Sequence, residues 1–164
     1  MKNYLLKLLL VSAVFVFPAC HPQKKIAGNY SYETECLGVE MDGTQSLKAF
    51  GTGSNNTDAI EQAKKNAVRD VLFKGIRKGK PDCELRPVLT EVNALENHKS
   101  YFNIFFADGG PYKNYVNTKD GTGEQELIKD GNAKGAGVQF GVVVQVLRSA
   151  LIKRMTDDNI LNNK

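Results

Sequence analysis

The chain has 164 residues, with 22 Lys and Arg against 18 Asp and Glu and a formal net charge of +4. This length is sufficient for one domain with a hydrophobic core. The densest basic run, Arg77-Lys78-Gly79-Lys80, is typical of a solvated helix end. Charge therefore does not indicate a nucleic-acid partner, and we expect none.

The first 20 residues have the pattern of a bacterial lipoprotein signal. Lys2 and Lys7 form a positive amino-terminal region, an apolar run covers 8–17, and the small residue Ala19 precedes Cys20. The run is too short for a typical membrane-spanning helix. We therefore expect residues 1–19 to be removed, and we expect Cys20 to carry acyl chains that anchor the protein to a membrane.

Two features of the signal leave alternatives open. Phe17 and Pro18 stand where a lipoprotein site usually has Leu and a small residue, so an ordinary secreted protein and an uncleaved anchor remain alternatives.

Residues 20–29 are polar and broken by Pro and Gly, as in a flexible tether. Because no acidic run follows Cys20, we expect the protein to be anchored at the periplasmic face of the outer membrane. Residues 30–160 then form one domain, followed by a polar tail over 161–164.

The domain is expected to begin with a β-hairpin. Residues from Tyr32 to Val39 alternate in polarity and predict a strand. Asp42-Gly43 is a strong turn signal, and 47–50 begins the return strand.

The next element is predicted to be a long helix. Apolar residues recur at helical spacing over 57–78, and three alanines among them allow close packing on a sheet. Thr57 or Asp58 is placed to cap the start, with Glu61 in position for a capping box. Gly79 is expected to end the helix.

The second half of the domain is predicted to contain shorter elements. These are a helix over 97–107 with aromatic residues at core spacing, a strand over 112–117, a projecting hairpin or loop over 118–137, a strand over 138–146 and a helix over 147–155. The element order indicates an α+β fold with a largely antiparallel sheet and helices packed on one face.

The chain contains three cysteines. If Cys20 is acylated, Cys36 and Cys83 remain as a pair in an oxidising compartment. A disulfide between them would close a loop of about 46 residues and stabilise the domain by roughly 4 kcal/mol. Two free buried thiols are the alternative, because sequence does not define the separation of the Cα atoms.

Several short motifs resemble a known family. The motif residues are Ala49-Phe50-Gly51-Thr52-Gly53, Asp58-Ala59-Ile60, Ala63, Asn66-Ala67-Val68 and Leu147-Arg148 with Leu151. They resemble small Gram-negative lipoproteins and the amino-terminal domain of flagellar assembly protein T, in which a strand ending in A-x-G-x-G precedes an alanine-rich helix. The resemblance implies an interaction or assembly module of the envelope and brings no catalytic residues.

The strand-to-helix turn is the first candidate site. Gly51 and Gly53 precede a helix and could cradle a phosphate at its N-terminus, but Asn56 replaces the third glycine of a dinucleotide motif. A tight turn in which Gly avoids a Cβ clash is the favoured interpretation. We nevertheless predict a contact surface here, since functional residues gather on loops. Its predicted members are Gly51, Gly53, Asn55 and Asn56, together with the loop over 118–137.

Catalytic and metal-binding patterns are sparse. His21 lies in the tether, so His98 is the one histidine of the domain, which excludes a multi-histidine zinc site. We expect no metal and no cofactor. A hydrolase that pairs His98 with Cys36 or Cys83 is the least favoured hypothesis.

The sequence therefore predicts a membrane-anchored, non-catalytic interaction or assembly module of the cell envelope with a protein partner. The alternative is a lipoprotein that binds a glycan or lipid through aromatic residues over 101–106 and 112–115.

Overall fold

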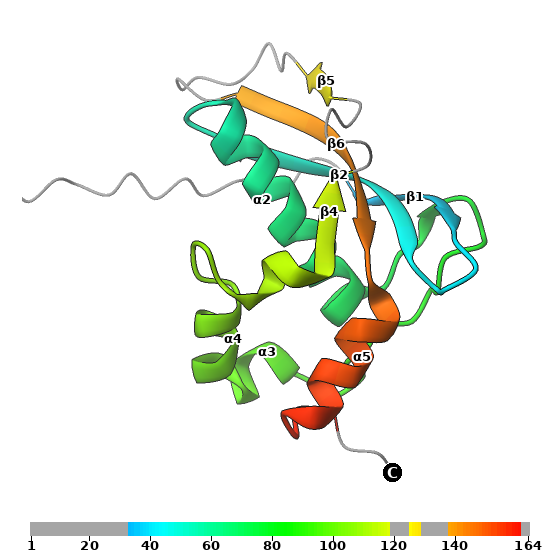
Figure 1. Ribbon diagram of the computed structural model, residues 1–164, viewed down its shortest axis with the longest axis vertical. Helices are drawn as coiled ribbons and strands as arrows, with labels where there is room; N and C mark the ends of the chain where they lie inside the picture. Colours follow the sequence, from blue (N-terminus) through cyan, green and yellow to red (C-terminus); the bar gives the residue numbers. More distant parts are fainter. Residues whose placement is uncertain (1–32, 119–124, 129–137, 162–164) are drawn as a thin grey trace, which may run out of the picture.

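The structure, a computed structural model, describes residues 33–118, 125–128 and 138–161. The leader, Cys20, the tether and most of the loop over 118–137 lie outside these ranges. The described chain forms an α+β fold in which helices pack against one mixed, mostly antiparallel sheet (Figure 1). The predicted fold class is confirmed.

The sheet has the strand order β3-β1-β2-β6-β4, and β5 also pairs with β6. Its strands are β1 (Glu35–Val39), β2 (Gln45–Gly53), β3 (Lys78–Gly79), β4 (Val116–Thr118), β5 (Gln125–Ile128) and β6 (Val138–Val146). Every pairing is antiparallel except that of β1 with β3. The predicted hairpin and the predicted strand over 138–146 are thus present, and β2 and β6 form the long central pair.

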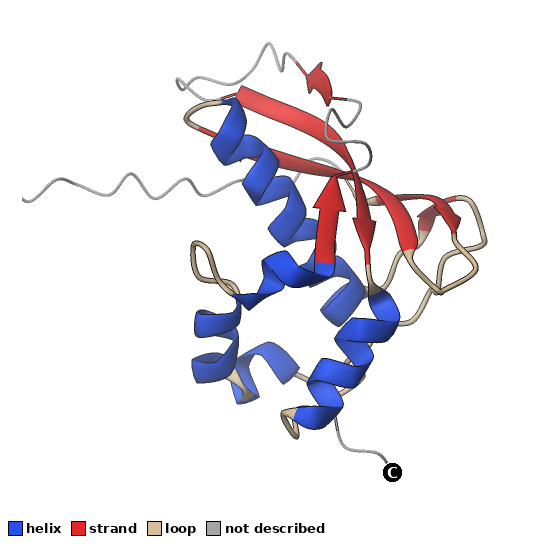
Figure 2. Cartoon of the chain, in the orientation of Figure 1, coloured by secondary structure: helices blue, strands red, loops and turns tan. Residues whose placement is uncertain are grey.

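The helical elements are α2 (Asn56–Arg69), a π-helix (Asp70–Lys74), α3 (Ala94–Asn97), α4 (Lys99–Phe105), a 3₁₀ helix (Pro111–Tyr115) and α5 (Arg148–Asp157). Figure 2 shows the strands gathered in one part of the molecule, with α3, α4 and α5 at the opposite end. Among the described residues, no helix combines the length and apolar character needed to span a membrane.

The packing of α2 on the sheet depends on two glycines. Ala59 and Ala63 are completely buried against β2. A Cβ atom on Gly51 would overlap the carbonyl oxygen of Ala59 and the amide nitrogen of Ala63, and one on Gly53 would overlap the amide nitrogen of Ala59. Because glycine has no Cβ, the helix backbone lies directly on the strand.

Buried polar side chains fix the register of α2 on the sheet. Asn66 donates through Nδ2 to the Phe50 carbonyl at 2.8 Å. One turn further on, Asp70 accepts a 2.5 Å hydrogen bond from the buried Thr34 hydroxyl. Such bonds satisfy polar groups that would be costly to bury unpaired, so they favour one position of the helix along the strand.

The helical segment continues past the end of α2 as the π-helix, and it ends earlier than predicted. Gly75 has a φ of 74°, and its N–H donates to the Asp70 carbonyl, which closes the π-helical turn. A side chain at Gly75 would overlap the Leu85 carbonyl. The predicted end at Gly79 is therefore wrong: the left-handed turn at Gly75 stops the helix, and Gly79 lies in β3.

Two carbonyl groups of the π-helix accept hydrogen bonds from a later loop. The N–H groups of Val88 and Leu89 donate to the carbonyls of Val71 and Leu72, at 3.0 and 2.9 Å. These bonds satisfy orphan groups at the helix end. They also bring the loop that contains Cys83 back against the core.

Two further predictions are corrected. The alternating residues Tyr112 to Tyr115 form a 3₁₀ helix and not a strand, because Pro111 provides a preset first helical residue; the strand begins at Val116. The helix predicted over 97–107 is mostly α4 and ends at Phe105, and a separate short helix, α3, precedes it from Ala94; the two are interrupted at His98, where the backbone leaves helical geometry.

Candidate functional site

Cys36 and Cys83 form a disulfide, with their Cα atoms 5.9 Å apart. Both residues are buried. The bond joins β1 to the loop that follows β3. Because both sulfurs are used in the bond, neither is a free thiolate for pairing with His98; the imidazole instead lies 3.2 Å from Glu91.

The predicted contact surface at the strand-to-helix turn is divided by the structure. Gly51 and Gly53 are buried beneath α2, whereas Asn55 and Asn56 are exposed. Asn55 caps α2 by accepting the Asp58 N–H at 3.0 Å, so the predicted caps Thr57 and Asp58 are wrong. The glycines are required for packing, which agrees with the tight-turn interpretation.

The aromatic residues of the second half pack together in the core. Phe102, Phe105, Phe106 and Tyr112 are each at most 8% exposed. Tyr115 stacks on Phe105 with ring centroids 5.9 Å apart. These buried rings form core contacts and do not line a binding surface.

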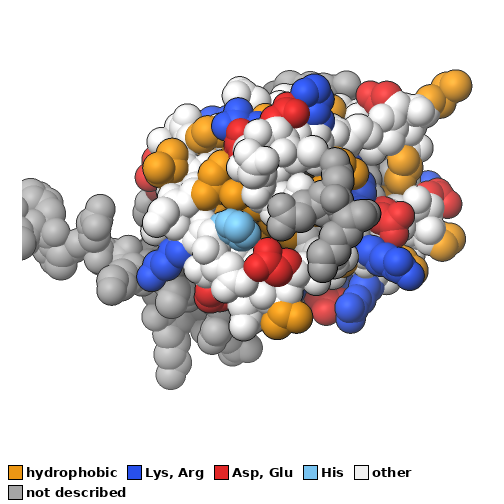
Figure 3. Space-filling view, turned by 90° about the horizontal axis from the view of Figure 1, so that it is seen from below, with side chains coloured by type: hydrophobic (Ala, Val, Ile, Leu, Met, Phe, Trp, Pro, Cys, Tyr) orange, Lys and Arg blue, Asp and Glu red, His pale blue; other side chains and the backbone are white. Residues whose placement is uncertain are grey.

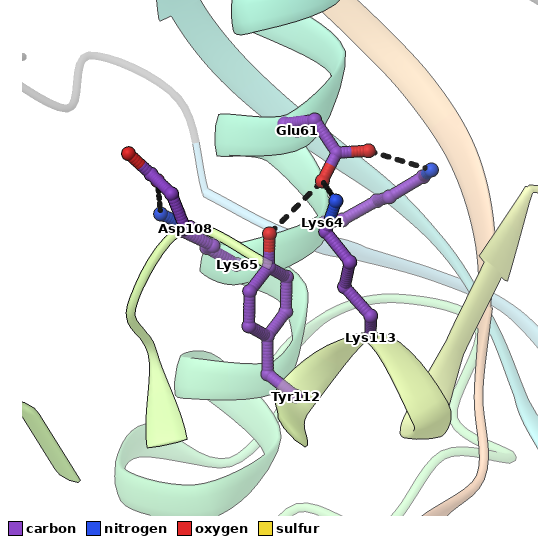
Figure 4. Close-up of polar contacts among 6 residues, drawn as sticks. All are labelled: Glu61, Lys64, Lys65, Asp108, Tyr112 and Lys113. Atoms are coloured by element: carbon purple, nitrogen blue, oxygen red, sulfur yellow. Dashed lines mark hydrogen bonds and ion pairs between the residues drawn. The ribbon is translucent and has the colours of Figure 1, made fainter. Parts of the chain in front are cut away.

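A polar cluster joins α2 to the 3₁₀ helix (Figure 4). Glu61 accepts hydrogen bonds from the Tyr112 hydroxyl at 2.9 Å and from Lys113 at 3.1 Å, and its other oxygen accepts from Lys64 at 3.1 Å. Beside it, Lys65 pairs with Asp108 at 2.6 Å. Glu61 therefore serves as a tertiary contact and not as the predicted member of a capping box.

The electrostatics of this cluster favour a structural role. Burial raises the pKa of Glu61, but hydrogen bonds from Lys64, Tyr112 and Lys113 outweigh burial and hold the pKa below its ordinary value. Burial and the bond to Glu61 raise the pKa of Tyr112. The pair thus keeps an ionised carboxylate and a neutral phenol at neutral pH, and neither is poised for proton transfer there.

A second polar contact joins α4 to α5. The Tyr101 hydroxyl donates to Asp158, which also accepts from Arg154 Nε, both at 2.5 Å. Burial and the bond to Asp158 raise the pKa of Tyr101 to about 12. In the part of the chain that is described, no group of three or more His, Cys, Asp or Glu side chains is arranged to hold a metal ion.

Exposed apolar side chains lie on the two segments that the disulfide joins. Leu37 and Val39 of β1 are 36% and 40% exposed, Met41 in the following turn is fully exposed, and Leu85 in the adjoining loop is 57% exposed. Cys83 Sγ lies 3.8 Å from the Gly38 carbonyl oxygen, so this loop runs against β1. We call Leu37, Val39, Met41 and Leu85 the hairpin patch.

The hairpin patch was missed by the sequence analysis. Its signal was present in Leu37, Val39 and Met41, which are apolar residues at alternate positions beside the buried Cys36. A β-bulge or irregularity between Cys36 and Gly38 shifts the pairing register of β1 with β2 at this point.

Charged side chains of both signs are mixed on the face of the molecule that is seen from below. Figure 3 shows one face on which Lys and Arg are interspersed with Asp and Glu, and no single sign dominates it. Such a face lacks the basic concentration typical of a nucleic-acid footprint.

Comparisons with known proteins assign no family. No family model matches the chain, and no solved structure matches it. A vitamin B12-dependent ribonucleotide reductase of Rhodopirellula baltica is 26% identical over 119 residues, which cover 69% of this chain. The match spans 11% of the reductase, so it does not bring that protein's activity to this chain.

We predict that Glu61→Gln lowers the unfolding free energy at pH 7 by about 1 kcal/mol, a small effect because the carboxylate is only partly buried. The folded-state pKa of Glu61 is depressed. Its stabilisation is therefore complete above the unfolded-state pKa and is lost as pH falls through the folded-state pKa. Urea unfolding should show a larger difference between variant and wild type at pH 7 than at pH 3.

Glu96→Gln is the matched control, because Glu96 is exposed on α3. An equal difference between Glu61→Gln and wild type at both pH values would contradict the assigned contact.

Proposed function

We propose that the chain is an exported lipoprotein, anchored through acyl chains on Cys20, whose domain is a non-catalytic interaction or assembly module of the cell envelope. The periplasmic face of the outer membrane is its proposed location. The leader pattern and the resemblance to small envelope lipoproteins support this proposal, as does the Cys36–Cys83 disulfide, since such bonds persist mainly in oxidising compartments.

The observation that carries the interaction role is the position of the hairpin patch. Its apolar side chains lie on two chain segments that the disulfide ties together. A surface held in one conformation loses little conformational entropy when a partner binds. Exposed apolar side chains in such a position are typical of a protein contact site.

The glycan- or lipid-binding alternative receives less support. It required the rings over 101–106 and 112–115 to line a surface, and Phe102, Phe105, Phe106 and Tyr112 are packed in the core. The hairpin patch contains no aromatic side chain with which to stack on a sugar ring. We therefore retain protein interaction as the proposed role.

Metabolic labelling with a fatty acid tests the anchor. Wild type should incorporate label and sediment with membranes, whereas Cys20→Ala should lose both, because lipid attachment requires the Cys20 side chain. Cys36→Ser/Cys83→Ser should keep the label per molecule of protein. Equal labelling of wild type and Cys20→Ala would refute the anchor.

Crosslinking followed by purification from membranes tests the interaction role. A partner recovered with wild type should be lost with Met41→Ser/Leu85→Ser, since truncating exposed apolar contacts removes their burial in the complex. Val92→Ser/Ile104→Ser is the control, because both side chains are exposed on other segments. Recovery of no protein with wild type would end the proposal.

A further inference from the structure

The central strands have two faces, and α2 covers one of them. Gly51 of β2 lies directly beneath Ala59 and Ala63 of that helix. Because successive side chains of a strand point to opposite faces, the even-numbered residues of β2 point away from α2. Among the described helices, α2 alone packs extensively on β2 and β6, and α3, α4 and α5 lie at the opposite end of the molecule (Figure 2). We call the side of β2 and β6 that faces away from α2 the second face.

The second face carries buried apolar side chains that adjoin one another. Phe50 pairs with Gly141, and its ring lies within 3.1 Å of the place that a Cβ on Gly141 would take. Lys48 pairs with Val143, and its Nζ lies 5.8 Å from the centre of the Phe50 ring. Phe50 is 6% exposed and Val143 is 9% exposed. Because a sheet face without helices is commonly solvated, this burial indicates that another segment covers the second face.

Composition narrows the choice of that segment. The structure leaves four ranges undescribed, namely 1–32, 119–124, 129–137 and 162–164. The two internal ranges consist of Gly, Ala, Thr, Asn and charged residues, and the last is Asn-Asn-Lys. Such segments gain little from burial on an apolar surface. With residues 1–19 removed as proposed, the large apolar side chains in these ranges belong to Ile26, Tyr30 and Tyr32.

The chain also enters the sheet beside Phe50. Glu35, the first residue of β1, pairs with Lys48, and β1 runs antiparallel to β2. The residues before Glu35 therefore approach from the side of Phe50. An extended segment covers about 3.3 Å per residue, so residues 26–32 are long enough to cross the neighbouring strand. Tyr30 and Tyr32 are two positions apart and point to the same side of an extended segment.

We propose, on the basis of the proposed cleavage before Cys20, that residues 26–32 dock on the second face and that Tyr30 and Tyr32 pack over Phe50 and Val143. The free part of the tether is then Cys20–Lys25. Six extended residues reach roughly 20 Å, so the anchored domain stays close to the bilayer. The partner of the interaction module must therefore be accessible at the membrane surface.

Photocrosslinking within the full, membrane-anchored protein tests this docking. Benzoylphenylalanine, a photoreactive analogue of phenylalanine, replaces Phe50 in one sample. In a second sample it replaces Thr52, which is half-exposed on the same face, so that the test does not depend on one buried position. The protein is digested, and mass spectrometry locates the crosslinked residues. We expect a crosslink to residues 26–32 from one or both positions.

The matched control position is Ile104, which is 69% exposed on α4. Because α4 lies at the opposite end of the molecule from the strands (Figure 2), benzoylphenylalanine at this position should give no crosslink to residues 26–32.

Substitution of the docking side chains provides the second readout. Tyr30→Ser/Tyr32→Ser should raise amide hydrogen-exchange rates in β2 and β6 by roughly threefold or more, with a smaller change in α5, because the second face loses its cover. Lys24→Ser/Lys25→Ser, in the free part of the tether, should leave the exchange rates unchanged. Equal exchange in wild type and Tyr30→Ser/Tyr32→Ser would contradict the docking.

Crosslinks from Phe50 and Thr52 only to residues 1–19 or 119–137, to another protein or to lipid would overturn the inference, as would the absence of any crosslink. Fatty-acid labelling of the same samples reports the anchor separately. Labelled protein without a crosslink to residues 26–32 would reject the docking and leave the anchor standing. Unlabelled protein with that crosslink would support the docking and count against the anchor.

Discussion

The contact between α2 and β2 determines the rest of the domain. Gly51 and Gly53 leave no side chain between the strand and the helix, so Ala59 and Ala63 lie against the strand backbone. This close approach explains why the helix uses alanines on its inner face. It also places Asn66 within hydrogen-bonding distance of the Phe50 carbonyl. The A-x-G-x-G pattern thus has a steric explanation that needs no bound ligand.

The remaining elements extend from this contact. The π-helix that follows α2 presents carbonyls to the loop at Val88 and Leu89, and that loop carries Cys83 to its bond with Cys36. The disulfide in turn holds the hairpin patch in place. A surface held in this way is consistent with the proposed interaction role, because little conformational entropy remains to be lost on binding. These contacts connect the fold to the proposed function.

Regular periodicity made much of the fold predictable. The Val-rich run over 138–146 is β6, and the alanine-rich helical pattern is α2. The end of that helix was not predictable, because the turn at Gly75 depends on the distant Leu85 carbonyl. Alternation at 112–115 suggested a strand, whereas Pro111 begins a 3₁₀ helix. The hairpin patch was missed, although Leu37, Val39 and Met41 stand at alternate positions beside the buried Cys36.

Gly51→Ala tests the central contact most directly. The added Cβ would overlap backbone atoms of α2, so urea denaturation should show an unfolding free energy lower by about 3 kcal/mol or more. Thr52→Ala, at the half-exposed position between the two glycines, should change it by about 1 kcal/mol or less. If Gly51→Ala were as stable as wild type, the close contact between α2 and β2 would not be the constraint on which this fold depends.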